Sequence, residues 1–280
     1  MRQFLKHKLS KENISNLLKV ERLLKLFAKP QVLASLQKFN HLKQYLKDNR
    51  FTTYILDSFP ITGEDTKYTS FDRHYVYHTA WAARVVSEIK PAVHTDISSS
   101  LYFSSIVSAF TPVDFYDYRP AKLELSGLNT KEGDLMKLPF ADKSIESISC
   151  LHTIEHVGLG RYGDPLDPQG DLKAISELKR VVKVGGNLLI VVPVGKQKIE
   201  FNAHRIYNPE KFVSYVSGDS DKSDANNPDA NSLSKNEFTL KEYAYIPETD
   251  SEGPLKRNSD LHEGQNDRYA CGCFWFVRNI

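Results

Sequence analysis

Three acidic residues stand at the ends of short apolar runs in the middle of the chain. Asp96 closes one run, Asp117 closes the next, and Asp134 follows Gly133 after a third. A carboxylate accepts hydrogen bonds from an amino group, from paired ribose hydroxyls or from an exocyclic adenine amine. A single aspartate in such a place is commonly a helix cap or turn former. Three in succession favour a shared ligand site.

A fourth apolar run ends in the titratable sequence Cys150-Leu-His-Thr-Ile-Glu-His156. Histidine is well suited to take a hydroxyl proton near neutral pH, so His156 is our candidate general base, with Glu155 beside it. His204 is a second candidate base, and a packing or capping role for His156 is the alternative. His152 and His156 also fit the H-x-x-E-H spacing of inverted zinc peptidases. That motif needs a helix, and here it follows a strand directly, so we predict no metal.

The segment that follows, residues 158–171, is dense in Gly, Pro and Asp. A loop of this kind over a cleft can act as a lid or acceptor clamp. Its candidate acceptor residues, which could bind sugar hydroxyls or a diphosphate, are Arg161, Tyr162, Asp164 and Asp167. The alternative is an Ω-loop held together by its own Asp and Tyr hydrogen bonds.

The elements that position these residues alternate in type. Short β-type runs predict strands at 92–97, 113–117, 128–132 and 145–151, and an apolar run predicts a fifth at 187–194. Helical spacing predicts helices at 72–89, 101–110 and 171–182, the last ended by Gly185-Gly186. Such alternation is typical of a mostly parallel sheet covered by helices. Two late strands, 238–246 and 270–278, have no helix between them and predict an antiparallel pair at the sheet edge.

The ends of this pattern differ from its centre. Ser10 can cap a first helix and Pro30 can start a second, so residues 1–70 are predicted to form a basic helical extension and residues 71–280 the main domain. Residues 1–50 hold twelve Lys and Arg against three Asp and Glu, a pattern that suits an anionic membrane or a partner, or simply a solvated face. Residues 217–236 read as a mobile loop.

Composition excludes several classes of protein. The net charge of +2 does not indicate nucleic-acid binding, and no apolar run approaches a membrane span. No signal peptide follows Met1. Three cysteines do not make a disulfide framework, so we expect reduced thiols and a cytoplasmic location.

Two segments resemble the class I S-adenosylmethionine-dependent methyltransferases. One is Gly133-Asp134-Leu-Met-Lys-Leu-Pro-Phe140 with the strand after it, and the other is Leu178-Lys-Arg-Val-Val-Lys-Val-Gly-Gly-Asn-Leu-Leu-Ile190. The resemblance implies a Rossmann-like α/β fold, a mostly parallel seven-stranded sheet with a C-terminal antiparallel strand pair, and S-adenosylmethionine as the cofactor. It implies that Asp117 holds the ribose and that Asp134 with the Leu135 backbone holds the adenine. It also implies that Asp96 lies near the methionine moiety, and we place His152 in the same pocket.

Further segments are similar to an uncharacterised bacterial family whose members are often encoded beside surface-polysaccharide genes. They are Trp81-Ala-Ala-Arg84, Asp117-Tyr-Arg-Pro120, residues 158–168 and Asn202-Ala-His-Arg205. This resemblance implies a glycan or sugar-nucleotide acceptor, to which we assign Asn202 and Arg205 as well. The predicted reaction is transfer of a methyl group to a sugar hydroxyl.

One segment departs from the methyltransferase pattern. Where glycines usually alternate after the first acidic residue, this chain has Ser98, Ser100 and Tyr102. Serine takes a positive φ less cheaply than glycine, and Tyr102 would crowd the site unless it turns away. A catalytically inactive scaffold in glycan assembly is therefore the alternative function, and direct sugar transfer is a third.

Overall fold

The structure is a computed structural model that describes residue 21 and residues 30–46, 50–218 and 237–280. The predicted helix after Ser10 and all but the start of the predicted loop 217–236 lie outside these residues. The chain divides into two compact units, Met1–Phe71 and Asp72–Ile280. In the described part of the first unit, α3 (Pro30–Tyr45) starts at the proline that the sequence indicated, and η1 (Ile55–Asp57) follows. No described helix combines the length and apolar character needed to cross a bilayer.

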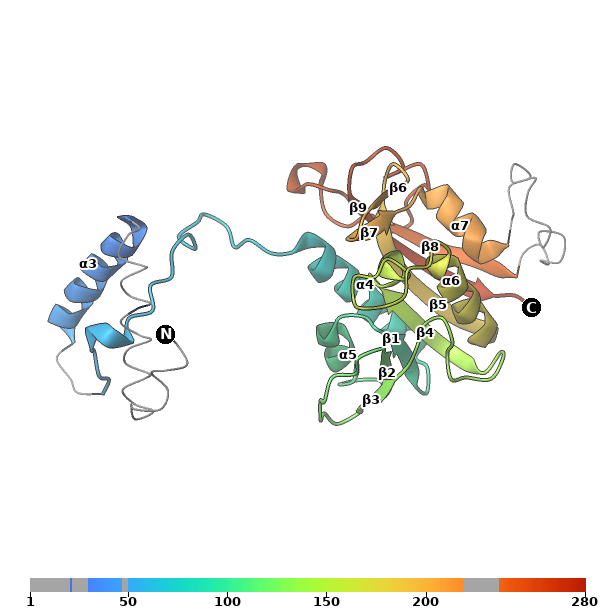
Figure 1. Cartoon of the computed structure of the whole chain (residues 1–280), viewed down its shortest axis with the longest axis horizontal. Helices are drawn as coiled ribbons and strands as arrows, with labels where there is room; N and C mark the ends of the chain where they lie inside the picture. Colours follow the sequence, from blue (N-terminus) through green and yellow to red (C-terminus); the bar gives the residue numbers. More distant parts are fainter. Residues whose placement is uncertain (1–20, 22–29, 47–49, 219–236) are drawn as a thin grey trace. The chain divides into compact units, whose positions relative to one another are not determined.

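The second unit is built around a seven-stranded sheet (Figure 1). Its elements in chain order are α4 (Arg73–Ile89), β1 (His94–Ile97), α5 (Leu101–Val107), β2 (Val113–Asp117), β3 (Leu128–Glu132), β4 (Ile145–Leu151), η2 (Ile154–His156), α6 (Gly170–Val181), β5 (Val182–Val194), β6 (Lys198–Glu200), β7 (His204–Ile206), α7 (Pro209–Ser217), β8 (Phe238–Ile246), η4 (Asp250–Glu252) and β9 (Ala270–Arg278).

The strands lie in the order β3-β2-β1-β4-β5-β9-β8. β1 to β5 are parallel, whereas β9 lies antiparallel between β5 and β8. The predicted seven-stranded, mostly parallel sheet with an antiparallel C-terminal pair is confirmed. The order also reverses at β1, where the chain first builds toward β3 and then crosses to β4. Ligands bind at such switch points, beyond the carboxyl ends of the strands.

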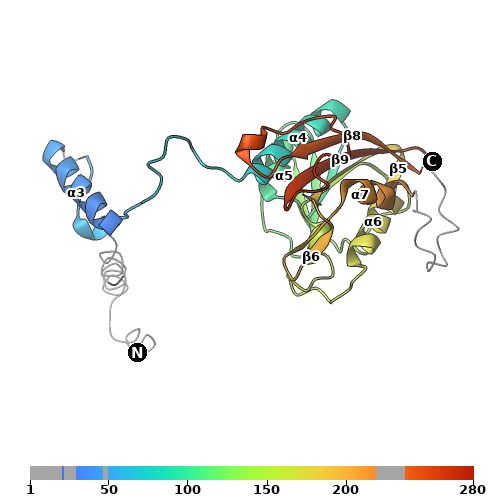
Figure 2. The ribbon, with the colours of Figure 1, turned by 90° about the horizontal axis from the view of Figure 1, so that it is seen from above.

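Helices cover both faces of this sheet (Figure 1, Figure 2). α6 and α7 pack in one apolar cluster, and α4 and α5 in the other. β5 serves both, because Leu188 and Ile190 belong to the first cluster while Leu189 and Val191 belong to the second. A strand buried on both faces is apolar throughout, which is why residues 187–194 were recognisable from sequence.

The junction between α6 and β5 differs from the prediction. The helix ends at Val181, one residue before its predicted end, but β5 begins at Val182 rather than at Asn187. The cause lies in the start of β4: Ser144 N–H donates to the Val181 carbonyl, and Ile145 pairs with Val182. The two glycines instead fall where the β4–β5 register shifts, and Gly185 has a φ of +74°. Pairing between distant strands thus overrides the local helical pattern.

Candidate functional site

A cavity of about 460 Å³ opens at the carboxyl ends of four parallel strands. Its walls come from the segments that follow β1, β2, β3 and β4, together with Tyr75 of α4 and part of the loop after η2. Among the residues predicted as ligands, those that line it are Ser98, Ser100, Asp117, Asp134, Leu135, His152, His156, Tyr162 and Asp164. The volume lies in the range of small-molecule sites.

Asp96 takes no direct part in this lining. The residue is fully buried, and its carboxylate accepts hydrogen bonds from Ser99 Oγ (2.5 Å), Ser149 Oγ (2.5 Å) and Ser104 Oγ. Burial raises the pKa of Asp96 to about 6, against the opposing effect of these three hydroxyls. That Asp96 lies near the methionine moiety stays a prediction: its carboxylate does not line the cavity, but its partner Ser99 does.

The serines that replace glycines make a turn of their own. Ser98 adopts a φ of +55°, and its N–H donates to the Tyr116 carbonyl (2.7 Å). Thr153 Oγ1 donates to the Ser98 carbonyl (2.9 Å), which ties the end of β1 to the segment after β4. Tyr102 is 81% exposed and turns away from the cavity, so it does not crowd the site. The chain has the backbone turn that glycines usually supply, at a cost of about 1–2 kcal/mol for the left-handed residue.

Asp117 and Asp134 occupy equivalent positions after β2 and β3. Each uses one oxygen to accept a backbone N–H two residues on, from Arg119 (2.7 Å) and Met136 (2.8 Å) respectively. Such Asx turns hold the carboxylates still while their second oxygens carry no hydrogen bond among the described residues. Gly133 packs so closely that an added Cβ would lie 3.1 Å from the Tyr116 side chain. The two acids thus stand preorganised at the mouth of the cavity.

α6 anchors the Leu-Pro-Phe segment through two residues that the sequence analysis did not single out. Glu177 accepts from Leu138 N–H (2.8 Å), and Arg180 donates to the carbonyls of Leu138 (3.1 Å) and Phe140 (2.8 Å). Arg180 also pairs with Glu177 at 2.7 Å. Their i, i+3 spacing on a predicted helix was the available signal. The pair fixes the segment that the resemblance assigned to the adenine.

His156 is held with a definite tautomer. Its Nδ1 lies 2.6 Å from the Ala203 carbonyl, which can only accept, and farther, at 3.3 Å, from Arg161 Nη1; the shorter contact places the proton on Nδ1 and leaves the lone pair on Nε2. Burial lowers the pKa of His156, and the nearby Glu155 carboxylate opposes this. Glu155 Oε1 lies 3.7 Å from His156 Nε2, so a proton gained there would lie beside a carboxylate. This geometry suits a general base.

The other two candidate histidines, His152 and His204, differ from His156 in their partners and their position. His152 Nδ1 bonds Glu155 Oε1 at 2.8 Å, and its φ is +56°. Residues 154–156 form η2, a single 3₁₀ turn, so His152 and His156 do not form the helical ligand pair of zinc peptidases. His204 lies on β7 and pairs with Glu200 at 3.3 Å, outside the cavity lining. Its role as a second base stays a prediction.

The loop after η2 is held together mainly by its own bonds. Asp164 accepts from the backbone of Gly158 (2.9 Å), Gly160 (3.3 Å) and Tyr162 (3.1 Å). Asp167 accepts from Gln169 N–H and Lys173. These bonds match the Ω-loop that was weighed against an acceptor clamp, although Tyr162 and Asp164 still face the cavity.

The remaining acceptor candidates, Arg161, Asn202 and Arg205, do not line the cavity. Arg205 is buried and donates to the carbonyls of Val157 (2.6 Å), Asp167 (3.4 Å) and Pro168 (3.3 Å), so it holds the loop from behind. Asn202 is exposed and outside the lining. Arg161 binds the Ala203 carbonyl (3.0 Å).

Arg119 is an addition to the candidate site, because it lines the cavity and its guanidinium lies 5.1 Å from the Tyr162 ring centroid. The guanidinium of Arg161 lies 5.3 Å from the same centroid. The Asp-Tyr-Arg sequence after the second strand was the signal for Arg119, which the sequence analysis quoted without a role.

Part of the sequence matches a known protein family. A family model described as Caenorhabditis protein of unknown function, DUF268, matches residues 137–221, which include β4 through α7. None of the curated proteins matches the sequence.

Among solved structures, the chain is similar to a possible histamine N-methyltransferase of Thermotoga maritima (14% identity, covering 73% of this chain and 91% of that one, TM-score 0.46). It is also similar to a TehB-like methyltransferase of Corynebacterium glutamicum (14%, 73% and 89%, TM-score 0.45). The N-methyltransferase NodS of Bradyrhizobium japonicum is a third (11%, 72% and 94%, TM-score 0.46).

The fold itself follows from the molecule. Five parallel strands run outward from a switch point at β1, and β9 enters antiparallel between β5 and β8. A cavity lies at the carboxyl ends of the strands, next to that switch point. The chain therefore has the class I methyltransferase fold that its sequence resembles.

Proposed function

We propose that the chain is an S-adenosylmethionine-dependent methyltransferase that O-methylates a sugar of a bacterial surface polysaccharide or its precursor. The observation that carries the proposal is the convergence of Asp117, Asp134 and His156 on one cavity at the switch point of the sheet. When bound, S-adenosylmethionine supplies an electrophilic methyl group on its sulfonium.

The residues present fit this cofactor at its adenosine end. The unbonded oxygens of Asp117 and Asp134 suit the ribose hydroxyls and the adenine amine, and Leu135 offers its backbone beside them. Gly133, which also lines the cavity, packs closely against Tyr116, and this contact fixes the backbone that carries Asp134. The methionine end differs, because the Asp96 carboxylate already accepts hydrogen bonds from three serine hydroxyls.

In the proposed reaction, His156 Nε2 accepts the proton of the acceptor hydroxyl as the hydroxyl oxygen takes the methyl group. Glu155 steadies the resulting imidazolium across 3.7 Å. Tyr75 and Tyr162 give the cavity two aromatic walls, and Arg119 gives it a cation. These groups suit a sugar ring with an anionic substituent. Much of the rate would come from holding the hydroxyl in line, which is a matter of position rather than of covalent chemistry.

Calorimetry with S-adenosylmethionine and S-adenosylhomocysteine tests the cofactor. Asp117→Ala and Asp134→Ala should each weaken binding about 10- to 100-fold, the effect of a lost charge-assisted hydrogen bond. Asp114→Ala is the matched control, because Asp114 lies on β2 but outside the cavity. Absence of binding by the unaltered protein would reject the cofactor.

Mass spectrometry of surface glycans from cells with and without the gene tests the acceptor. The unaltered gene should restore methylation to a deletion strain, His156→Gln should not, and His262→Gln, a change at an exposed histidine, should. Unchanged methylation after deletion would reject the acceptor.

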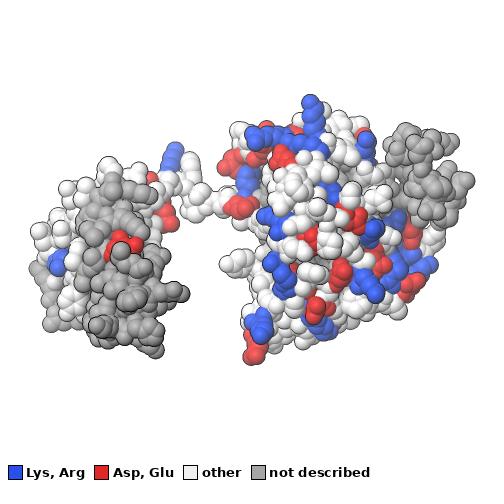
Figure 3. Space-filling model, viewed as in Figure 1, with Lys and Arg blue, Asp and Glu red and all other residues white. Residues whose placement is uncertain are grey.

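The inactive scaffold is the second candidate function, favoured by the occupied Asp96. A protein that binds the cofactor while the deletion leaves methylation unchanged would support it. For the basic residues 1–50 we propose peripheral contact with an anionic membrane surface or a glycan-assembly partner. On the face of the Asp72–Ile280 unit in Figure 3, basic and acidic side chains intermingle.

A further inference from the structure

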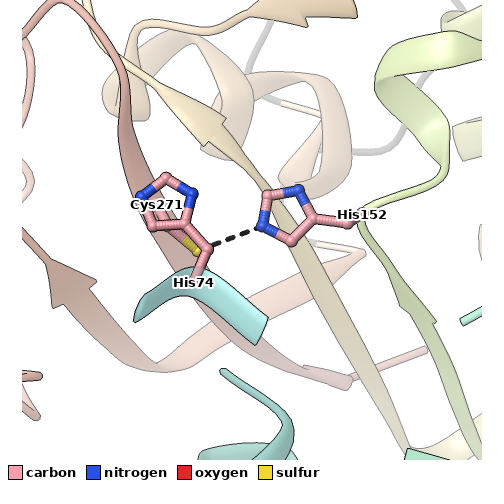
Figure 4. A group of neighbouring side chains, drawn as sticks. All are labelled: His74, His152 and Cys271. Atoms are coloured by element: carbon pink, nitrogen blue, oxygen red, sulfur yellow. Dashed lines mark hydrogen bonds between the residues drawn. The ribbon is translucent and has the colours of Figure 1, made fainter. Parts of the chain in front are cut away.

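Three potential metal ligands from separate elements converge behind the cavity (Figure 4). His74 comes from the first turn of α4, His152 from the segment after β4, and Cys271 from β9. Their ligand atoms all lie within 4.8 Å of one another. His152 and Cys271 are buried and His74 is half-buried. Of the three, only His152 also lines the cavity.

The spacing of two of these atoms is already that of a coordination edge. With Zn–S of about 2.3 Å and Zn–N of about 2.0–2.1 Å at tetrahedral angles, sulfur and nitrogen ligands lie about 3.6 Å apart. His152 Nε2 and Cys271 Sγ are 3.4 Å apart. His74 would need to close by about 1 Å, a distance that rotation of an imidazole on an accessible helix turn can supply.

Glu155 gives His152 the orientation of a metal ligand. Its Oε1 accepts from Nδ1 at 2.8 Å, which directs Nε2 toward Cys271. A carboxylate bonded to the far nitrogen of a ligating histidine is the usual outer partner in zinc sites. Glu155 is itself buried, and its Oε2 has no hydrogen-bond partner among the described residues. A buried carboxylate beside an imidazole is better compensated when a cation lies on the imidazole's other side.

His78 is a second observation that points to a ligand. It is fully buried, yet neither ring nitrogen makes a hydrogen bond of normal geometry among the described residues. Its ring centroid lies 4.9 Å from that of His152. His74 and His78 are four residues apart on α4, so they share one helix face, as paired zinc-binding histidines do. Buried polar atoms without partners are rare in folded proteins and call for an explanation.

We propose that His74, His152 and Cys271 bind a zinc ion, with the buried His78, whose ring lies beside that of His152, as a candidate for the fourth ligand. Imidazole and thiolate donors suit Zn²⁺ and exclude the oxygen-seeking Mg²⁺ and Ca²⁺. The ion would join α4 to β4 and β9 and so fix the cavity walls at Tyr75 and His152. Loss of the Cys271 thiol proton on binding balances one of the two charges of the ion.

The proposal is independent of the methyltransferase activity, because its readout is metal content. Full-length protein, purified with zinc and dialysed, should contain about one zinc per chain by plasma mass spectrometry. Replacement by Co²⁺ should give a thiolate-to-cobalt charge-transfer band and the visible bands of a tetrahedral site. Cys271→Ser should abolish the charge-transfer band and weaken zinc binding at least tenfold.

Cys150→Ser is the matched control, since Cys150 is equally buried but belongs to the apolar cluster on the other face of the sheet. It should keep both metal and spectrum. His74→Gln, at a half-buried helix position, should also lose at least tenfold in affinity with unchanged circular dichroism, which separates ligand loss from misfolding. Glu155→Gln should weaken binding about 10- to 100-fold. Unaltered protein without stoichiometric zinc, or Cys271→Ser protein that retains the cobalt spectrum, would overturn the proposal.

Discussion

The buried carboxylate of Asp96 should make the stability of the sheet depend on pH in an unusual direction. Three serine hydroxyls bond this carboxylate within the core of the switch point. The perturbation is Asp96→Asn, which keeps the shape and removes the titration. Hydroxyl rotors can turn to serve as acceptors for an amide, so the network should re-form.

The magnitude follows from the pKa of Asp96, which burial raises from 3.8 to about 6. At a pH between these two pKa values, folded Asp96 keeps a proton that unfolded Asp96 has released. The free energy of unfolding therefore falls as the pH rises through this range. At 1.36 kcal/mol per pKa unit, the difference of about 2.2 units amounts to about 3 kcal/mol. His94, whose pKa burial lowers to about 3, acts in the opposite direction. It is present in both proteins and cancels in the comparison.

Urea unfolding, followed by tryptophan fluorescence at several pH values, measures the effect. Both tryptophans, Trp81 and Trp275, are buried in the unit that contains the sheet. The stability of the unaltered protein minus that of Asp96→Asn should fall by about 3 kcal/mol between about pH 3.5 and pH 7. Asp114→Asn, a half-exposed control on β2, should show no such fall. Parallel pH profiles for the unaltered and Asp96→Asn proteins would refute the reasoning.

Three further expectations concern the loops around the cavity. Arg180→Ala removes two charge-assisted bonds to backbone carbonyls, so it should lower the free energy of unfolding by about 2–4 kcal/mol and weaken cofactor binding in calorimetry; an unchanged urea midpoint would contradict this. Gly158→Ala places a Cβ 2.1 Å from the Asp167 carbonyl at a φ of +78° and should cost more than about 3 kcal/mol in the same assay. Gly163→Ala, with open space and a φ of +87°, should cost only about 1–2 kcal/mol, and equal losses would show that the contact is unimportant. Tyr102→Ala should leave cofactor affinity unchanged, because the side chain faces solvent, and a marked loss would place Tyr102 in the site.

Most elements of the fold could be predicted from short-range patterns in the sequence. Residues 187–194 and the strand pair at the C-terminus could be recognised directly from the sequence, because strands that are largely buried contain few polar residues. The largest boundary error is the start of β5, which lies at Val182 rather than at Asn187, because Val182 pairs with Ile145, a residue distant in the sequence.

The candidate site was predictable where it depends on strand ends. Asp117, Asp134 and His156 reach one cavity because parallel strands end at the same edge, which follows once the fold is known. Asp96 also stands at a strand end, but its carboxylate accepts hydrogen bonds from three serines and does not line the cavity, so its place beside the methionine moiety stays a prediction. Strand direction is visible in sequence, whereas the local hydrogen-bond partners of a side chain are not.

Sequence alone therefore determined the order of the elements, the class of fold and the Gly133-Asp134 turn, all of which depend on periodicity and on neighbours in the chain. Only the tertiary structure brought Cys271 to within 3.4 Å of His152 across 119 positions, and His74 to the same place. The physical reason is the insertion of β9 between β5 and β8, which places Cys271 beside Pro193 near the carboxyl end of β5. A cysteine and two histidines that are far apart in the sequence come together only through that strand order.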